Sequence, residues 1–397
     1  MGRRVAIAGV GLTKCSSHRK DVTYPELVYE AVSGALTDAG IGFEQIDAVV
    51  YGSMDPFDGV FAPERWSVDS CVSAGFLNKP FLKITTGGTT GGSTALGAYY
   101  HVGSGMFDVV LAVASQRVGE TIEAQLVLNT AVDPIYERWI GAGAITIAAN
   151  QASNHFHYYG TTEEDLAMVA AKNYANALNN PYAHLQRHLS VEDALRSRMI
   201  SWPLRLSDCC PSSDGACAII FASEKRARQI AKQPAWVRGA GQITDNYFAG
   251  DRPWFHDWDS LAMLARRVYR QAKISDPMAE IQVAEPYVLL SAGDNGVRGP
   301  GLRRARPRHR TDPQGRDGHG WEGALLPLGG NALHQPHRRY GSHSRGGSGA
   351  AGDGQGRQAA GAQREDGSGP LLGRRHRLSH HDDPGQGSSL EGGGRLP

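Results

Sequence analysis

A run of glycines and small hydroxyl residues carries the clearest chemical signal in this sequence. Residues 84–96 read ITTGGTTGGSTAL, and an apolar pattern with helical spacing begins at Ala95. Glycine lets the backbone turn sharply and lets another group approach it closely. Just before a helix, such a turn directs free N–H groups outward, where they can hold a carbonyl oxygen or an anion. The alternative is that the glycines only permit close packing between a strand and a helix.

The run resembles the nucleophile loop of the thiolase superfamily, and most closely that of its sterol-carrier-protein-type and lipid-transfer branch. In those enzymes a cysteine opens the small-residue run, where the helix N-terminus lowers its pKa. Counted back from the GSTAL segment that begins at Gly92, that position is Thr89 in this sequence. The resemblance implies that Thr89 is a catalytic residue. It also implies that the substrate is bound by glycines of the loop, namely Gly87, Gly88, Gly91 and Gly92.

A threonine at this position changes the expected chemistry. A hydroxyl without an adjacent base is a poor nucleophile, and it does not form an anion as easily as a thiol does. The resemblance then implies a retro-aldol cleavage next to a thioester, which needs no acyl-enzyme, rather than thiolysis. The thiolase-like fold and acyl-CoA binding are expected in either case.

Composition and charge exclude several classes of protein. The chain has 397 residues and a net charge of +1, so neither nucleic acid nor an anionic membrane is an expected partner. The run at 84–96 is neither a dinucleotide fingerprint nor a Walker loop. The five cysteines have no spacing typical of a metal site or a disulfide framework, and no apolar stretch is long enough to cross a bilayer. We therefore expect a cytoplasmic protein without a metal site, large enough for two core-forming units.

Alternating strands and helices predict an α/β fold. The predicted strands cover residues 5–11, 46–52 and 107–114, and a predicted helix covers residues 24–39. Residues 208–220, DCCPSSDGACAII, resemble the superfamily's Ser-x-x-Asp-Gly-Ala-x-Ala segment, in which a turn leads into a buried strand. Asp214 is expected to anchor that turn, and Cys210 and Cys217 are expected to be small core residues.

Residues 117–205 interrupt this alternation and are richer in His, Asn, Tyr and Arg, which predicts an inserted cap region. The segment at 154–159 contains His155 and His157. No third ligand has matching spacing, so aromatic packing is favoured over a metal site. His184 lies in the same region, which covers the substrate pocket in the resembled family. The resemblance therefore implies that His184 binds the substrate.

A second helix-and-strand pattern repeats the first. Residues 261–274 have helical spacing and residues 281–285 predict a strand, as residues 27–49 do. The thiolase fold is such a duplication: two similar βαβαβ halves with mixed, mostly parallel sheets, an inserted loop domain, and the active site between the halves. By this match Tyr287 is a catalytic residue whose phenol donates to an oxyanion or acts as a general acid. Alternatively, Tyr287 anchors the end of a strand.

Residues 291–397 differ abruptly in composition from the rest of the chain. They contain 26 of the 50 glycines and no Ile, Phe, Met, Lys or Cys, which is too little apolar surface for a core. A natural disordered tail, an RNA-binding basic segment and a frameshift near residues 288–292 are three interpretations. When residues 330–341 are read from the second base of each codon, they permit GMLCTNPIGATG, which resembles the signature of the second thiolase half. The nucleotide sequence after codon 290 tests the frameshift.

The expected organisation follows from these segments. The first thiolase half occupies residues 1–116 and 206–235, with the inserted region at 117–205 between its two parts. The second half begins at 236–290, and the glycine- and arginine-rich, frameshift-like tail occupies 291–397.

Two functions remain open. The first is a thiolase-like acyl-CoA enzyme of lipid or sterol side-chain degradation, which cleaves or forms a C–C bond next to a thioester. The second is a non-catalytic acyl-CoA- or lipid-binding subunit of a thiolase-type complex. A ketosynthase-type enzyme would need a cysteine in the loop, and Cys71 lies too early. The resemblance implies no cofactor other than the coenzyme A of the substrate, a homodimer, and an OB-fold, zinc-ribbon acyl-CoA-binding subunit as a further partner.

Overall fold

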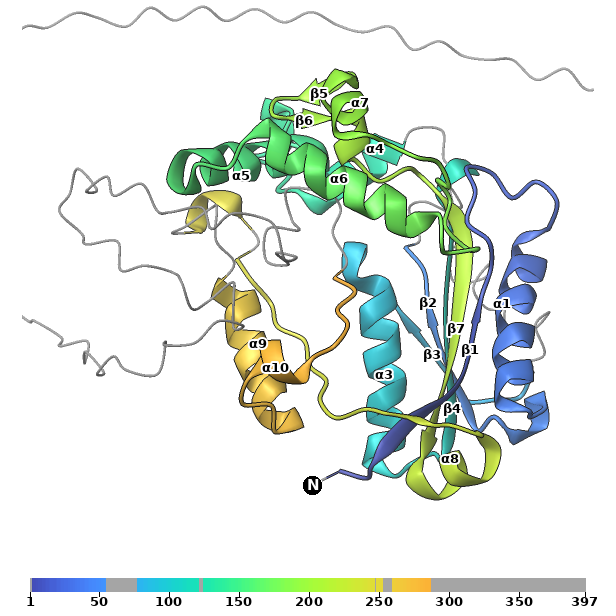
Figure 1. The fold of residues 1–397 in the computed structure, drawn as a ribbon. Coiled ribbons are helices and arrows are strands. Elements are labelled where there is room, and N and C mark those ends of the chain that lie inside the picture. Colours follow the sequence, from blue (N-terminus) through green and yellow to red (C-terminus); the bar gives the residue numbers. More distant parts are fainter. Residues whose placement is uncertain (1, 55–76, 121–123, 247, 253–258, 287–397) are drawn as a thin grey trace, which may run out of the picture. The chain divides into compact units, whose positions relative to one another are not determined.

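The computed structural model describes residues 2–54, 77–120, 124–246, 248–252 and 259–286 (Figure 1). All of them belong to one unit of the chain, Met1–Pro336. The predicted catalytic residue Tyr287 and the tail at 291–397 lie outside the described residues.

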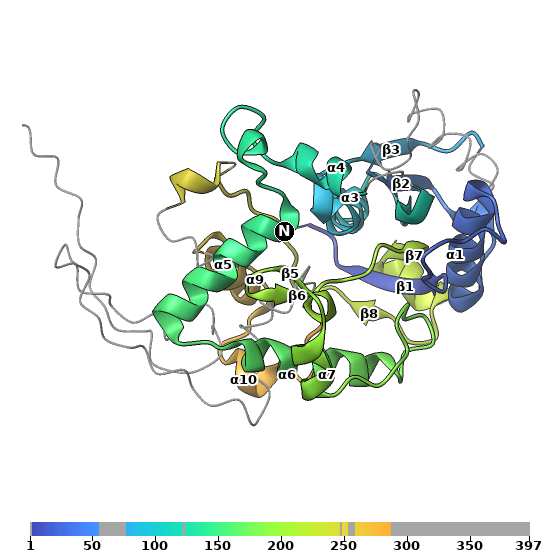
Figure 2. The ribbon, with the colours of Figure 1, turned by 90° about the horizontal axis from the view of Figure 1, so that it is seen from above.

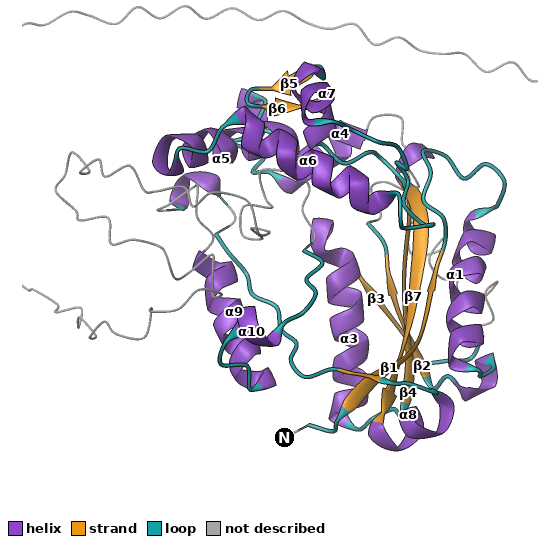
Figure 3. Ribbon diagram, in the orientation of Figure 1, coloured by secondary structure: helices purple, strands orange, loops and turns teal. Residues whose placement is uncertain are grey.

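A six-stranded sheet organises the first part of the chain (Figure 3). Its strands, in spatial order, are β3 (Phe81–Ile84), β2 (Ala48–Gly52), β4 (Val109–Arg117), β7 (Asp214–Ser223), β1 (Val5–Leu12) and β8 (Ala235–Trp236). β2 pairs in parallel with β3 and β4, whereas β4–β7, β7–β1 and β1–β8 are antiparallel. The sheet is mixed, as predicted. The prediction that it is mostly parallel is wrong for the pairings described, because β7 runs opposite to both of its neighbours.

Helices cover the two faces of this sheet: α1 (Tyr24–Ala39) lies on one face and α3 (Thr90–Ser104) on the other (Figures 1 and 2). Successive side chains of β2 alternate between them. Val49 and Tyr51 pack in the cluster with α1, and Ala48 and Val50 pack in the cluster with α3. A strand buried on both faces has a continuous apolar sequence, which explains why this run was predicted as a strand.

Local signals define the ends of α1. Thr23 and Glu26 form a reciprocal capping box at its start, and Gly40 at its end has a φ of 66°. The predicted helix over residues 24–39 is therefore confirmed, and it buries eight of its side chains.

The insertion between β4 and β7 has a small core of its own. It contains α4 (Ala124–Leu128), α5 (Ala144–Tyr159), α6 (Glu163–Ala177), α7 (Val191–Arg196), β5 (Met199–Ser201) and β6 (Leu204–Arg205). The side chains of Ala149, Leu166 and Leu204 meet in this core. In α5, the His155 ring lies 4.6 Å from that of Tyr159, which confirms aromatic packing there. The described residues contain no group of three or more His, Cys, Asp or Glu that could hold a metal ion.

Two glycines of β1 allow α1 to pack directly on that strand. A Cβ at Gly9 would lie 2.5 Å from the carbonyl oxygen of Ala35, and one at Gly11 would lie 2.0 Å from that of Ala31. Any side chain at either position would force backbone apart, so glycine is required by the close approach.

The same arrangement recurs after α8 (Glu224–Ile230) and β8. The chain at 237–241 packs against α9 (Asp259–Ala272), which confirms the helical pattern predicted there. A Cβ at Gly239 would lie 2.8 Å from the carbonyl oxygen of Val268, and one at Gly241 would lie 3.0 Å from Leu264 Cδ1. The glycine pair and the contacted helix positions therefore recur in the same order and at similar spacing.

The prediction of a strand at 281–285 is wrong. After α10 (Pro277–Glu280) the described chain has no regular structure, and Val283 is 79% exposed. A strand needs neighbouring strands to pair its backbone groups, and the described residues provide none at this position.

Candidate active site

A cavity of about 740 Å³ opens beside the N-terminus of α3. One wall is formed by α3 and by Ile7 and Phe221 of the sheet; the other is formed by the chain at 237–245 and the start of α9. Most lining side chains are apolar. The polar ones are Thr89, Ser93, Gln242, Asp245, Arg252 and Ser260. A mainly apolar cavity with few polar groups is typical of a site for a small hydrophobic ligand.

The glycines of the predicted loop face open space. Gly87 has a φ of 61°, and among the described residues a Cβ at any of the four predicted positions would meet nothing within 4 Å. Gly97, farther along α3, behaves differently, because a Cβ there would lie 2.7 Å from Ile84 Cδ1. Close strand–helix packing therefore explains Gly97 but not Gly87, Gly88, Gly91 or Gly92. The loop glycines leave backbone accessible to another group.

Thr89 stands at the N-cap of α3 and is the last residue of the short 3₁₀ turn η3 (Gly87–Thr89). Its hydroxyl is exposed and donates to Thr86, with Oγ1 2.9 Å from the Thr86 carbonyl oxygen and 3.1 Å from Thr86 Oγ1. Among the described residues, no histidine, carboxylate or lysine accepts its proton. Within the part of the chain that the structure describes, Thr89 therefore has no base that would activate it as a nucleophile.

Hydrogen bonds link Thr86 to two side chains of the cavity wall. Thr86 Oγ1 lies 2.7 Å from Ser93 Oγ, and Gln242 Nε2 donates to Ser93 Oγ over 3.1 Å. Neither Ser93 nor Gln242 was among the site residues expected from the sequence. Ser93 lies within the GSTAL segment, and Gln242 directly follows the repeated glycine pair; those signals could have identified them.

His184 belongs to a different hydrogen-bond network. Its Nδ1 lies 2.7 Å from Ser213 Oγ and its Nε2 lies 3.1 Å from Ser17 Oγ. It thus connects the loop after β1 to the turn before β7, and it does not line the cavity with Thr89. Of the predicted site residues, the cavity wall brings together Thr89 and Gly92.

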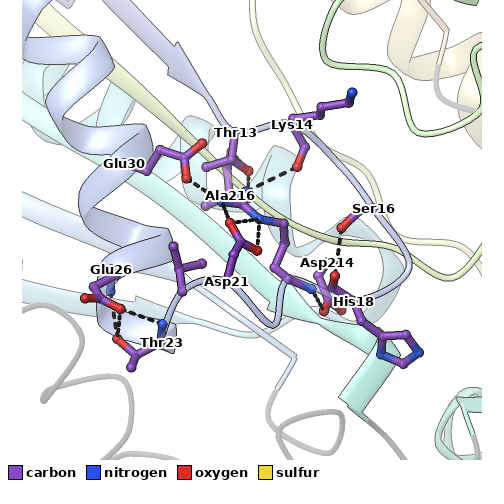
Figure 4. Close-up of polar contacts among 12 residues, drawn as sticks. Thr13, Lys14, Ser16, His18, Asp21, Thr23, Glu26, Glu30, Asp214 and Ala216 are labelled. Atoms are coloured by element: carbon purple, nitrogen blue, oxygen red, sulfur yellow. Dashed lines mark hydrogen bonds and ion pairs between the residues drawn. The ribbon is translucent and has the colours of Figure 1, made fainter.

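Asp214 joins two loops that lie far from it in the sequence, rather than the turn that leads into β7. Its carboxylate is fully buried and accepts hydrogen bonds from the backbone N–H of Arg19, at 2.9 Å, and of Gly119, at 2.7 Å. Figure 4 shows Asp214 beside the loop after β1, together with the capping box of α1. Asp214 therefore holds two loops together at the ends of β1 and β4.

No cysteine lines the cavity among the described residues. Burial raises the pKa of the Cys209 thiol to about 11, and burial also raises the pKa of Cys15 and Cys217. These thiols are therefore protonated near neutral pH. Cys217 is partly buried, but Cys210 is exposed, so the core assignment of Cys210 is wrong; it precedes Pro211 outside the strand.

Within the described part of the chain, no helix has the length and apolarity that a membrane span needs. The mixed sheet, the two covering helices and the glycine turn at the start of α3 define an α/β protein with a thiolase-like fold. Residues 5–225 match the family model described as the N-terminal domain of thiolase. The chain belongs to the thiolase superfamily, as its sequence motifs predicted.

Relatives fall in several branches of this superfamily. An acetyl-CoA acetyltransferase of Methanothermobacter thermautotrophicus is 32% identical over 74% of this chain and 76% of its own. Sterol carrier protein 2 of Gallus gallus is 30% identical over 61% of this chain but only 45% of its own. A 17-hydroxy-3-oxo-4-pregnene-20-carboxyl-CoA lyase of Mycobacterium tuberculosis is 30% identical over 75% of this chain and 80% of its own. The predicted likeness to the sterol-carrier-protein and lipid-transfer branch is therefore confirmed.

A solved structure described as an Ltp2-ChsH2(DUF35) aldolase is also similar. It is 26% identical to this chain, covers 70% of it and 71% of its own chain, and has a TM-score of 0.58.

Proposed function

We propose that this protein acts on an acyl-CoA thioester of lipid or sterol type and cleaves the C–C bond next to the thioester by a retro-aldol reaction. One observation carries the proposal. A threonine that meets no base among the described residues stands at the open, glycine-rich start of a helix, at the wall of a mainly apolar cavity with no described thiol. Relatives named as a lyase and an aldolase support the same reaction class.

The reaction requires no acyl-enzyme. In a 3-hydroxyacyl thioester the hydroxyl proton leaves, the carbonyl forms at C3, and the C2–C3 bond breaks. The electron pair of that bond passes to C2 and the thioester oxygen as an enolate, and C2 is then protonated. The products are a ketone or aldehyde and a shortened acyl thioester.

The start of α3 suits the charge that develops in this reaction. The helix dipole places partial positive charge at this end of α3, although the N–H of its first residue, Thr90, bonds to the Gly87 carbonyl oxygen. No side chain caps α3, and the open positions at Gly91 and Gly92 leave room for a thioester oxygen. Donors directed at a developing oxyanion contribute strongly to catalysis. Tyr287 remains the predicted acid–base residue.

A partner subunit is part of the proposal. The similar aldolase structure is named as an assembly with a DUF35 protein. We propose that this chain also acts beside an acyl-CoA-binding subunit of that kind, and that it forms a homodimer.

The test uses the full chain with two substrates, 3-hydroxydecanoyl-CoA and a steroid thioester with a 17-hydroxyl and a 20-carboxyl-CoA. We expect the shortened products in chromatography and an unchanged intact mass of the protein. Thr89→Cys should accumulate a covalent acyl adduct with acetoacetyl-CoA that the wild type does not form. Thr37→Val on α1, whose hydroxyl bonds only within its own helix, is the matched control and should behave as the wild type.

The outcomes separate the candidate functions. An acyl adduct on Thr89 in the wild type would establish a thiolase mechanism instead. Binding without products would favour the non-catalytic subunit. Absence of both binding and products would reject the assignment to acyl-CoA chemistry.

A further inference from the structure

We infer that Ser93 is the hydroxyl that donates a hydrogen bond to the carbonyl oxygen of the bound thioester, and that Gln242 is the positioning residue that holds Ser93 in that role. The inference rests on the proposed binding of an acyl-CoA in the cavity beside α3. It assigns the donor within that site to a residue other than Thr89.

The donor of each hydrogen bond in this row of side chains can be assigned in turn, starting from Thr89. A hydroxyl has one hydrogen and two acceptor positions. Thr89 gives its hydrogen to Thr86, whose carbonyl oxygen and Oγ1 lie 2.9 and 3.1 Å away. Thr89 therefore has no hydrogen left for a ligand.

Thr86 can pass hydrogen bonding on from Thr89 to Ser93. Its Oγ1 accepts from Thr89, and its own hydrogen can be given to Ser93 Oγ at 2.7 Å. Gln242 fixes the other side of Ser93, because an amide nitrogen only donates, and Nε2 lies 3.1 Å from Ser93 Oγ. Ser93 then accepts two hydrogen bonds.

In that arrangement the hydrogen of Ser93 is left for a ligand, whereas without a ligand it can be given to Thr86 Oγ1. Ser93 is only 8% exposed, and it lines the cavity. When a ligand oxygen in the cavity accepts the hydrogen of Ser93, Thr86 can donate to Ser93 in its place, so the exchange leaves no buried hydroxyl without a partner. Two donors directed at its oxygen also make Ser93 a stronger donor, since hydrogen bonds in a chain reinforce one another.

The ligand that fits this donor has an oxygen acceptor at the apolar cavity. The thioester carbonyl is that acceptor in an acyl-CoA, whereas a thioether analogue has the same chain and no carbonyl. We therefore expect the wild type to bind decanoyl-CoA about tenfold more tightly than S-decyl-CoA, the effect of one well-placed hydrogen bond.

The experiment measures both dissociation constants by calorimetry on the full chain at about pH 8, where a glutamate is ionised. Ser93→Ala should reduce the preference for decanoyl-CoA to within about twofold. Gln242→Glu should do the same, because a carboxylate only accepts and takes the hydrogen of Ser93 for itself. Gln242→Met should keep an intermediate preference, since Ser93 is then less well held but still has its hydrogen.

This order distinguishes the proposal from a structural role. If Gln242 only held the two walls together, Gln242→Glu would retain the bond to Ser93 and would resemble the wild type more than Gln242→Met does. Gln271→Met is the control, because Gln271 anchors the same segment by accepting from the Ala240 N–H at 2.9 Å. It should leave the preference unchanged. Thermal midpoints of all variants check folding.

Two failures are distinguishable. A wild type that binds both ligands equally would overturn the role of Ser93 and leave the proposed function standing. A wild type that binds neither would reject the proposed function itself, and with it this inference. A preference retained in Ser93→Ala would likewise overturn the assignment.

Discussion

Two pairs of a strand-like segment and a helix can be compared: β1 with α1, and residues 237–241 with α9. They share a pair of glycines under the helix, but they differ in how many side chains the helix buries. Each strand-like segment has two glycines that let a helix pack on its backbone. α1 buries eight side chains, whereas Ala262 and Ala272 are the buried positions described in α9, and Leu261 and Met263 are each 45% exposed.

The difference lies in what each pair packs against. α1 packs on β1 and also on β7 and β4, the next two strands of the sheet on one side of β1. α9 meets a short segment, and residues 281–285 add no strand beside it. An amphipathic helix obtains its stability from the sheet that covers its apolar face. A pair of glycines alone therefore positions a helix without burying its side chains.

Replacing a glycine of each pair by alanine should give the largest difference in unfolding free energy between the two pairs. In Gly11→Ala the new Cβ would meet the Ala31 carbonyl oxygen at 2.0 Å, so the backbone must move. We expect a loss of about 4 kcal/mol in the free energy of unfolding, measured by urea denaturation. Gly241→Ala meets the flexible tip of Leu264 at 3.0 Å and should lose less than about 1 kcal/mol. Equal losses would show that the two contacts are equivalent.

Truncation of one leucine in each helix should have the next largest effect. Leu27 of α1 is fully buried, and Leu27→Ala should lower the free energy of unfolding by about 3 kcal/mol through a cavity. Leu261→Ala in α9 removes a side chain that is 45% exposed, so its loss should stay below about 1 kcal/mol. A large loss for Leu261→Ala would mean that α9 is covered as α1 is.

Removal of an N-cap should sharpen the comparison at a smaller scale. Thr23 caps α1, and Thr23→Ala should cost about 1 kcal/mol, seen as a lower thermal midpoint. Asp276 caps α10 by accepting from the N–H groups of Met278 and Ala279. Because α10 packs less extensively, Asp276→Ala should leave the global midpoint unchanged. A global shift in that variant would contradict the distinction.

The loss of stability at low pH should show the smallest difference between the two pairs. The Thr23 backbone N–H, and then the Thr23 hydroxyl, lower the pKa of Glu26 below its ordinary value of 4.5. A lowered folded-state pKa stabilises above the unfolded-state pKa, and this contribution is lost as pH falls through the folded-state value. Glu26→Gln should therefore lose less stability than the wild type between about pH 6 and pH 3.

Glu280 provides the matched position in the second pair. The N–H groups of Asp276 and Ser275 lower its pKa in the same way. Glu280→Gln should nevertheless show the same pH dependence of global unfolding as the wild type, because its surroundings open before the sheet does. If Glu26→Gln and Glu280→Gln changed the pH dependence of unfolding equally, the two pairs would not differ in this respect.

Much of the first part of the fold could be predicted from short-range patterns. The helix at 24–39 and the small-residue turn before α3 each depend on residues a few positions apart, whereas Asp214 accepts from Arg19, 195 positions away. The strand predicted at 281–285 failed because a strand depends on neighbours that its own residues do not specify.

The candidate site divides in the same way. The sequence by itself determined Thr89 at a helix start and the glycines around it, because glycine turns and helix ends are local properties of the backbone. Only the tertiary structure decided that Gln242 reaches Ser93, 149 positions away, and that His184 joins Ser17 and Ser213 instead of the cavity. Hydrogen bonds between distant residues form only after packing has brought their elements together, so no local pattern encodes them.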